Sequence, residues 1–485
     1  MLPDDVLLEI LNFCVDEDID GTFDSFKGQR RQEWITLAHV CRRWRSVVFQ
    51  SPHRLHLRLF CTLETPARDI VDIWPPLPLI IQDCYGRVSH QNGASGSNNL
   101  VAALELNDRV YQIRLLNLSS SELEYLTDSA ANKPFPELTD LYLGMTQGDF
   151  QGDAPGPILP DSFLGGSAPR LQSLVLLRVP FPGLPKLLLS ATYLVNLDLS
   201  FIPRSGYIPP EALATSLSAL TSLNFLCLNF RHPRPRPTLG GRRQRPPLLA
   251  RSILTNLTEI RFKGSSEYLE EILARVDAPR LNELDIYFFN QIIFDTPQLF
   301  QLISRRPTLR APENGHIEFS SGAITFRFPS QTPNYTALRV VILCSTSEWQ
   351  LSSLGQVCTS SLPPLSTLED LYIFEDQRCP SRWQDDVENM LWLELLHPFG
   401  AVKNLYLCEE FMPRISLALQ ELVGGRTTEV LPTLENIFLK GFQPSGPLLR
   451  GIEKFIAARQ LTSRPIAVSR WDMDPKPYKF PYYIY

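Results

Sequence analysis

The chain has 485 residues, of which 44% are hydrophobic and 20% are charged, and its formal net charge is −6 at pH 7. Such a composition excludes a wholly disordered chain, and the length allows more than one structural module. The modest negative charge argues against general nucleic-acid binding. The lack of an uninterrupted apolar run of about 18 residues argues against a membrane-spanning helix.

The cysteines and the amino terminus indicate the compartment. The nine cysteines are scattered and form no Cys-x-x-Cys pair, which is typical of reduced, mostly buried thiols. Asp4, Asp5 and Glu9 stand where a secretory signal peptide would carry positive charge and then a plain apolar run. We therefore expect a cytoplasmic or nuclear protein.

Residues 1–50 are predicted to form a small helical module. In residues 2–11, Pro3 suits the first helical turn, the acids suit its positive end, and apolar residues recur at three- and four-residue steps. Residues 34–49 repeat this spacing and keep their arginines off the apolar face. So few residues bury little apolar surface. The module is therefore expected either to cap the rest of the chain or to bind another protein.

Two stretches of this module, Leu-Pro-Asp-Asp-Val-Leu-Leu-Glu-Ile-Leu (2–11) and Ala-His-Val-Cys-Arg-Arg-Trp-Arg (38–45), together resemble an F-box. The resemblance implies a three-helix module that docks on the Skp-type adaptor of a cullin-RING ubiquitin ligase. The spacer 15–33 is longer than the family norm and polar, and it is predicted to be a loop. Carried over by position, the implied adaptor contacts are Leu2, Pro3, Val6, Leu7, Ile10, Leu11, Val40, Cys41 and Trp44.

Residues 51–106 are predicted to connect this module to a repeat array and to cap the array. From there the phrase Leu-x-x-Leu-x-Leu recurs, and its copies begin at Val110, Leu138, Leu171, Leu194, Leu223, Leu257, Leu281, Leu338, Leu368, Val402 and Leu434. Successive copies start 23 to 34 residues apart, except for a gap of 57 residues after Leu281. We interpret this gap as two units with a degenerate copy near Leu309.

This period and phrase resemble leucine-rich repeats. Alternate residues of a strand face one side, so the last two leucines of each phrase should point inward and build an apolar spine with the neighbouring units. The predicted fold is α/β: a small N-terminal all-α F-box followed by an irregular leucine-rich-repeat solenoid, with parallel strands on the concave face and helices or loops on the convex face. An ordinary α/β sheet with leucine-rich strands is the alternative.

The solenoid is expected over residues 107–445, and a C-terminal cap over residues 446–485. A basic, Pro-rich stretch at 231–251 is predicted to be a mobile loop, with nuclear localisation or binding of an acidic partner as the alternative role. Ala-Ala-Arg-Gln-Leu (457–461) and Ser-Arg-Trp (469–471) resemble the tails of fungal (basidiomycete) F-box proteins.

The sequence shows no catalytic motif. It has no Gly-x-Ser-x-Gly, no Gly-x-x-x-x-Gly-Lys and no His-Glu-x-x-His, and its seven histidines are dispersed. We therefore predict no catalytic residue, no cofactor and no metal site. Asp385 and Asp386 open an apparent helix, where capping explains them better than metal binding.

Outward-facing residues of the strands are expected to pave the concave surface and bind a target protein. They are Asp140, Tyr142, Asp198, Phe225, Arg261, Asp285, Tyr287, Tyr372, Tyr406 and Phe438. The predicted function is a non-catalytic substrate receptor that binds the Skp-type adaptor through the F-box and a target protein through the repeats, with no nucleic acid or membrane as partner. The alternatives are an interaction scaffold whose first helices only cap the solenoid, and an unrecognised hydrolase or transferase.

Overall fold

The computed structural model places the chain in two compact units, residues 1–223 and 224–485. It describes residues 3–15, 39–50, 59–61, 77–82, 93–146, 157–181, 186–233, 251–291, 294–310, 314–329, 336–344, 346–360, 362, 365–376, 379–380, 389–423, 426–440 and 447–471. The predicted spacer loop 15–33, apart from its first residue, and nearly all of the predicted basic loop 231–251 lie outside these residues.

The first unit begins with two helices, α1 (Asp4–Val15) and α3 (Arg42–Gln50), which contact each other. Leu7 and Leu8 on α1 and Val47 and Val48 on α3 are buried. At the start of α1 the Asp4 carboxylate accepts two hydrogen bonds from the Arg43 guanidinium, at 3.0 Å from Nε and 2.6 Å from Nη2. The two predicted helical runs thus form a pair with a small apolar interior.

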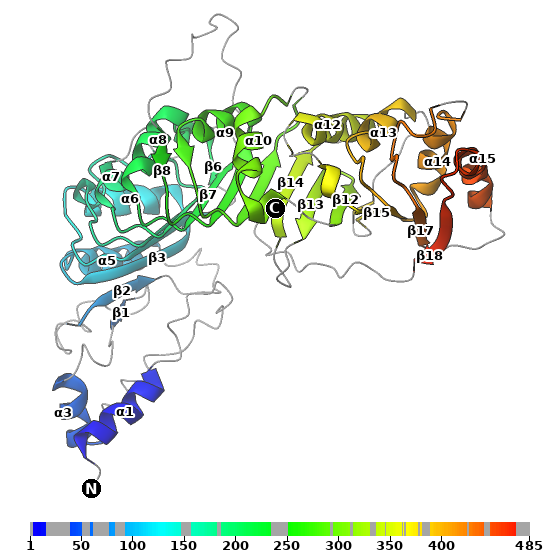
Figure 1. The fold of residues 1–485 in the computed structure, drawn as a ribbon. Coiled ribbons are helices and arrows are strands. Elements are labelled where there is room, and N and C mark those ends of the chain that lie inside the picture. The colour runs from blue at the N-terminus through cyan, green and yellow to red at the C-terminus, as the bar shows by residue number, and fades with distance from the viewer. Residues whose placement is uncertain are drawn as a thin grey trace, which may run out of the picture. The chain divides into compact units, whose positions relative to one another are not determined.

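The rest of the first unit is a parallel sheet whose strands follow one another in chain order (Figure 1). The strands are β1 (Leu59–Cys61), β2 (Leu79–Gln82), β3 (Val110–Leu118), β4 (Asp140–Met145), β5 (Ser173–Leu177) and β6 (Asn196–Ile202). The intervening helices are α5 (Gly93–Leu104), α6 (Ser120–Ala130), α7 (Lys186–Ser190) and α8 (Pro210–Ala219), with the short 3-10 turns Leu164–Gly166 and Arg204–Gly206. A strand order equal to the chain order is the topology of a solenoid.

The repeated leucines form the interior of this sheet. In β4 the side chains of Leu141 and Leu143 are buried, and they pair in register with Leu174 and Leu176 of β5. The same two positions continue into β6, so each leucine of one unit packs beside its counterpart in the next. Burying each such side chain stabilises the fold by roughly 1.5–3 kcal/mol, which explains why the phrase recurs.

In the second unit, ten strands of the described residues belong to the main sheet. In spatial order they are β7 (Phe225–Phe230), β9 (Glu259–Gly264), β11 (Glu283–Phe288), β14 (Thr336–Leu343), β13 (Ala323–Pro329), β12 (Asn314–Ser320), β15 (Asp370–Glu375), β16 (Asn404–Leu407), β17 (Asn436–Lys440) and β18 (Ala467–Trp471). A separate parallel pair is formed by β8 (Ser252–Ile253) and β10 (Val276–Asp277).

Helices of the second unit lie on one side of its strands (Figure 1). They are α9 (Ser266–Leu273), α10 (Pro297–Ser304), α11 (Pro307–Arg310), α12 (Ser347–Ser360), α13 (Asn389–Leu396), α14 (Met412–Gln420) and α15 (Pro447–Leu461), and a 3-10 turn spans Leu365–Thr367. The architecture is therefore a mixed α/β array of strand-and-helix units, similar to a leucine-rich-repeat solenoid.

One feature departs from the predicted parallel array. The long gap after Leu281 holds two strands, β12 and β13, which form an antiparallel hairpin. β13 also runs antiparallel to β14, while β12 runs parallel to β15. Leu309 lies in the short helix α11 and is buried, so the prediction of a degenerate repeat strand near Leu309 is wrong. Two alternating seven-residue runs joined at Ser321 and Gly322 favour a hairpin over a repeat.

A buried arginine links α15 to the segment before β17. The Arg459 side chain is fully buried, and its guanidinium donates to the backbone carbonyls of Thr427 (3.2 Å), Pro432 (3.2 Å) and Leu434 (3.0 Å). These carbonyls belong to the segment that leads into β17, and β18 then pairs in parallel with β17. α15 and β18 both fall within the predicted C-terminal cap 446–485, whose residues 472–485 lie outside the described structure.

Among the described residues, none of the helices combines the length and the apolar character that crossing a membrane requires.

Candidate interaction surface

In the second unit, the residues between the buried strand positions form one face of the sheet, which we call the open face. In β9 and β11 every second side chain is buried and the others are partly exposed. Strand pairing aligns the residues of this face into rows, in which most side chains are at least partly exposed and a few, such as Cys227 and Arg327, are buried. We call the middle one the central row, which runs through Cys227, Arg261, Asp285, Arg339, Arg327, His316, Tyr372, Tyr406, Phe438 and Ser469.

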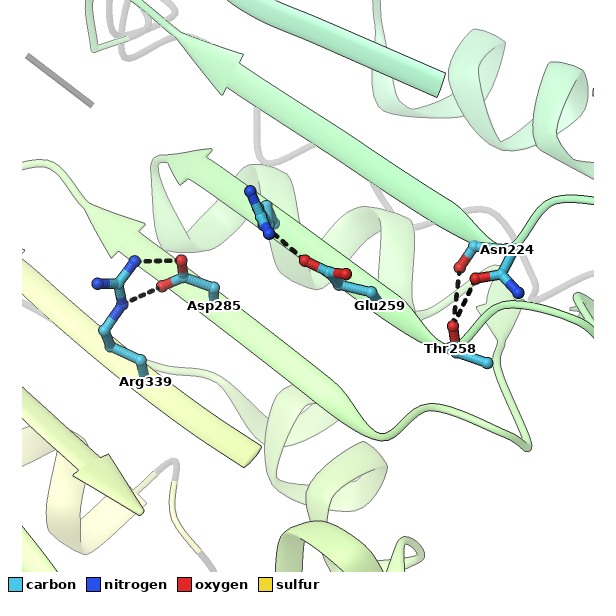
Figure 2. A network of polar contacts seen from close by, with 6 residues as sticks. Asn224, Thr258, Glu259, Asp285 and Arg339 are labelled. Carbon is cyan, nitrogen blue, oxygen red and sulfur yellow. Dashed lines mark hydrogen bonds and ion pairs between the residues drawn. The ribbon is translucent and has the colours of Figure 1, made fainter. Parts of the chain in front are cut away.

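Arg261, Asp285 and Arg339 are neighbours in the central row, and we call this part the charged half. It is built around the pair of Asp285 and Arg339 (Figure 2). The Asp285 carboxylate accepts a hydrogen bond from Arg339 Nε at 2.7 Å and a second one from Nη2 of the same guanidinium. Arg261 Nε donates to Glu259 Oε1 at 2.6 Å. Near the start of the same strands, the Thr258 hydroxyl donates to the side-chain oxygen of Asn224 at 2.6 Å. Paired side chains therefore fix the geometry of this half.

Aromatic rings lie next to the two arginines of the charged half. The Arg261 guanidinium lies 5.1 Å from the centroid of the Phe225 ring, and the Arg339 guanidinium lies 5.0 Å from that of Tyr287. Both distances are within the range of a cation–π interaction. Four predicted target contacts, Phe225, Arg261, Asp285 and Tyr287, are thus brought into one cluster, and Arg339 completes it.

Burial and neighbouring charges change the pKa values in this cluster. Burial opposes the charged form of Arg339, but the charge of Asp285 and its hydrogen bonds outweigh burial and raise the pKa of the guanidinium. Burial raises the pKa of the Glu283 carboxyl, and the nearby Glu259 charge adds to this effect against the attraction of Arg261. Burial lowers the pKa of Lys263. Burial therefore disfavours the charged forms of Glu283 and Lys263, whereas the Asp285 partner keeps Arg339 charged.

Arg327 and His316 join the two halves of the central row. Arg327 on β13 lies opposite Arg339 on one side and His316 on the other. Its guanidinium is 4.0 Å from the Glu318 carboxylate and 5.5 Å from the centroid of the Phe374 ring. Burial lowers the pKa of His316 to about 3, and the charge of Arg327 contributes to this shift. His316 is therefore neutral at physiological pH.

The other half of the central row is aromatic, and we call it the aromatic half: His316, Tyr372, Tyr406 and Phe438. Its rings stack along four neighbouring strands, with centroid distances of 4.6 Å, 4.1 Å and 4.6 Å in that order. The Trp471 ring of β18 lies 5.6 Å from Tyr406 with its plane steeply inclined. Each member of the aromatic half is partly exposed. Stacked, partly exposed rings offer a large contact area with little loss of side-chain freedom on binding.

Hydrogen-bonded polar side chains border the aromatic half. Asn404 Nδ2 donates to Asp370 Oδ1 at 2.6 Å, and Asn436 Nδ2 donates to Asn404 Oδ1 at 2.8 Å. These three residues occupy corresponding positions on β15, β16 and β17. Burial raises the pKa values of Tyr372 and Tyr406, and the charge of Asp370 adds to both shifts. Both phenols thus stay protonated and can donate hydrogen bonds at neutral pH.

The remaining predicted target contacts lie in the first unit. Tyr142 on β4 and Asp198 on β6 occupy the same row on either side of Val175 of β5. Asp140 accepts a hydrogen bond from the Thr139 hydroxyl at 2.7 Å, and Asp198 accepts one from Ser200. These three predicted residues are partly exposed, but they form no aromatic stack like that of the second unit in the described residues.

Where the structure describes them, most of the predicted adaptor contacts on the helical pair are exposed, and one is buried. Leu7 is buried, whereas Val6, Ile10 and Val40 are 41%, 38% and 59% exposed. Pro3 and Cys41 are also exposed, and Trp44 is partly exposed. Leu2 and the side chain of Leu11 lie outside the described residues. Val6 and Ile10 are four residues apart on α1 and therefore share a face of that helix. The helical pair thus presents apolar side chains to solvent.

Several residues of the open face were missed by the sequence patterns. Arg327 and His316 belong to the hairpin, where no repeat phrase marks the inward positions. Arg339 was missed because the phrase at residues 338–343 misplaces the register: Leu338, Val340 and Ile342 pair with the inward residues of β11, not Val341 and Leu343. The alternation of Ile317 and Phe319 with polar residues was the sequence signal that could have placed His316 on the open face.

In the part of the chain that the structure describes, no cluster of three or more His, Cys, Asp or Glu side chains is arranged to hold a metal ion. The search with protein-family models gives no match, and neither does the search of curated proteins. Among solved structures, a leucine-rich-repeat protein of Leptospira interrogans is similar over 81% of this chain and 89% of its own, with 13% sequence identity and a TM-score of 0.26. Similarity this distant assigns no activity.

Proposed function

We propose that the chain is a non-catalytic substrate receptor of a cullin-RING ubiquitin ligase. In this proposal the α1–α3 pair binds the Skp-type adaptor, and the open face binds a target protein. The observation that carries the proposal is that Val6, Ile10 and Val40 are exposed at positions where an F-box contacts the adaptor. Such a ligase operates in the cytoplasm or nucleus, the compartments that scattered, unpaired cysteines favour.

The helical pair has both buried residues that hold it together and exposed apolar residues that a partner could contact. Leu7 and Val48, buried on helices that contact each other, give the pair an interior, and the ion pair between Asp4 and Arg43 links the two helices. The apolar side chains of Val6 and Ile10 are then left on the outside. Exposed apolar side chains gathered on a small helical surface favour binding of another protein.

The open face supplies the second binding surface. Its arginines and aromatic rings belong to the residue types that carry most of the binding free energy at protein interfaces. Holding a target there while the adaptor is bound elsewhere keeps the target near the ligase and raises its effective concentration. Neither half of the proposal requires bond chemistry in this chain, so we propose no catalytic residue.

Co-purification with a Skp-type adaptor tests this proposal. Val6→Asp combined with Ile10→Asp puts charge on the exposed face and leaves the buried Leu7 in place, so we expect adaptor capture to fall at least tenfold. Leu461→Asp is the matched control, because Leu461 is an 88% exposed leucine on α15, a different helix. Equal capture by the double variant and the control, with unchanged circular dichroism, would reject the adaptor site.

An interaction scaffold without a ligase is the second candidate. It is favoured by the burial of Leu7 and Leu8, which gives the helical pair a structural role of its own. This candidate predicts that the intact chain captures no adaptor and still captures target proteins through the open face. Affinity purification of wild-type chain beside Tyr372→Ala, followed by mass spectrometry, distinguishes the two candidates, because only the ligase receptor brings down adaptor and cullin together.

A further inference from the structure

The aromatic half of the open face lies beside the point where the described chain ends. Trp471 is the last residue of β18, and its ring is 5.8 Å from the centroid of Tyr372 and 5.6 Å from that of Tyr406. The Trp471 side chain is buried in these contacts, and Lys440 of β17 is its partner in register. The chain thus leaves the last strand beside the stacked rings.

The sequence that follows Trp471 matches this surface chemically. Residues 472–485 read Asp-Met-Asp-Pro-Lys-Pro-Tyr-Lys-Phe-Pro-Tyr-Tyr-Ile-Tyr, with four tyrosines, one phenylalanine and three prolines. Prolines disfavour a helix and favour an extended polyproline conformation. Proline-rich segments of this kind bind to surfaces lined with aromatic side chains. The two lysines of the segment complement the Asp370 carboxylate at the border of the aromatic half, one oxygen of which accepts from Asn404.

The length of this segment is sufficient to cover the aromatic half. Four strand steps separate β18 from β12, which is roughly 19 Å at the usual spacing of about 4.8 Å between strands. An extended polyproline chain covers about 3.1 Å per residue, so roughly six residues reach His316. The 14 residues after Trp471 therefore also reach the level of Arg339, six strand steps and roughly 29 Å from β18.

We propose that residues 472–485 dock in cis on the aromatic half of the open face and compete with any partner that binds there. Tyrosine, phenylalanine and proline side chains of the segment pack on Tyr372, Tyr406 and Phe438, and the segment continues towards the charged half. The docking itself is independent of adaptor binding. Its inhibitory consequence rests on the proposed function, in which the open face binds the target.

Tethering makes a weak contact sufficient. A short tether gives an effective concentration in the millimolar range. If the free segment bound the open face with a dissociation constant of about 100 μM, chains with a covered face would outnumber chains with an uncovered face by about ten to one. A target would then bind about tenfold more weakly than it would to an uncovered face. Such a device allows release by a stronger partner without any change of fold.

The test uses full-length chains and a fluorescent peptide with the sequence of residues 472–485. One chain is wild type, and the other carries Tyr478→Ser, Phe480→Ser, Tyr482→Ser and Tyr483→Ser, which leaves the length unchanged. We expect the peptide to bind the tail-substituted chain at least tenfold more tightly than the wild-type chain, as measured by fluorescence anisotropy. A peptide of the same composition in scrambled order serves as the control and should bind neither chain.

The site of binding is tested by adding Tyr406→Ala to the tail-substituted chain, which should weaken peptide binding at least tenfold. Tyr142→Ala, a partly exposed strand tyrosine of the first unit, is the matched control and should leave binding unchanged. If Tyr406→Ala lowers the thermal midpoint strongly, Phe438→Ser replaces it. Absence of peptide binding, equal binding to both chains, or binding insensitive to these changes would overturn the proposal. The assay contains neither adaptor nor target, so its failure leaves the proposed function untouched.

Discussion

Tyr372 and Tyr406 stack face to face on neighbouring strands, with ring centroids 4.1 Å apart and ring planes 8° apart. The two rings are in register, and the stack continues to His316 on one side and Phe438 on the other. Because the members of a stack support one another, each ring of the aromatic half serves both the stability of the sheet and the shape of the open face.

Tyr372→Ala is therefore expected to lower the free energy of unfolding of the second unit as well as to weaken binding at the open face. It removes ring contacts on both sides, each worth about 0.5–1.5 kcal/mol beyond buried area, so a loss of roughly 1–3 kcal/mol is expected in urea denaturation. Tyr193→Ala, at a 64% exposed tyrosine, should change the unfolding free energy by less than about 0.5 kcal/mol. A loss no larger than that control would show that the stack is not energetically coupled.

The Asp285–Arg339 pair is expected to behave as a coupled unit. Both side chains are largely buried, with exposures of 20% and 13%, so removing one partner leaves a poorly solvated charge. Asp285→Leu and Arg339→Met should each cost about 3 kcal/mol of unfolding free energy, while the double variant should cost clearly less than twice that. A double-mutant cycle in urea measures the coupling. Strict additivity of the two changes would show that the ion pair makes no net contribution.

His316 is expected to make the second unit sensitive to acid. Its folded pKa of about 3 lies below the ordinary value of 6.5, so the unfolded chain takes up a proton first as the pH falls. Stability should therefore decrease between about pH 6.5 and pH 3, on the order of 1–2 kcal/mol by pH 5. His316→Phe keeps a ring in the stack and should remove this part of the loss. Parallel urea curves at pH 7 and pH 5 for both proteins would show whether the histidine is responsible.

Arg459 is expected to be the anchor of the C-terminal elements. Its side chain is fully buried and donates to three backbone carbonyls, of which that of Pro432 also accepts from Arg464 at 2.7 Å. Arg459→Ala should loosen the contact between α15 and the segment 427–434 before β17, and increase hydrogen exchange in 447–471 by at least tenfold, because a buried charged donor is worth about 1.5–3 kcal/mol. Lys454→Ala, an exposed position of the same helix, is the control and should leave exchange unchanged.

The sequence predicted the local pattern well where each unit is repeated. Leu141 and Leu143 were recognised as inward residues from spacing alone, because alternation in a strand and burial of one face follow from the backbone. Tyr372 and Tyr406 followed from the same register. The predicted adaptor contacts on α1, the fungal resemblance and the absence of catalysis are not tested by the structure and stay predictions.

The hairpin and the contacts across it could not be predicted from the repeat phrase. Asp285 and Arg339 are 54 residues apart in the chain, and they meet because β12 and β13 insert on the far side of β14. A phrase of six residues carries no information about which strand becomes the neighbour. In residues 338–343 the apolar run Leu-Arg-Val-Val-Ile-Leu also satisfies two registers, and only pairing with β11 selects one of them.

In the proposed function, an exposed helical surface binds an adaptor while a separate sheet face binds a target. Titration calorimetry of the intact chain with a purified Skp-type adaptor measures this most directly. We predict a one-to-one complex with a dissociation constant below about 1 μM for wild type, and at least tenfold weaker binding when Val6 and Ile10 are both changed to Asp. No heat of binding with wild type, or the same constant for both proteins, would contradict the account.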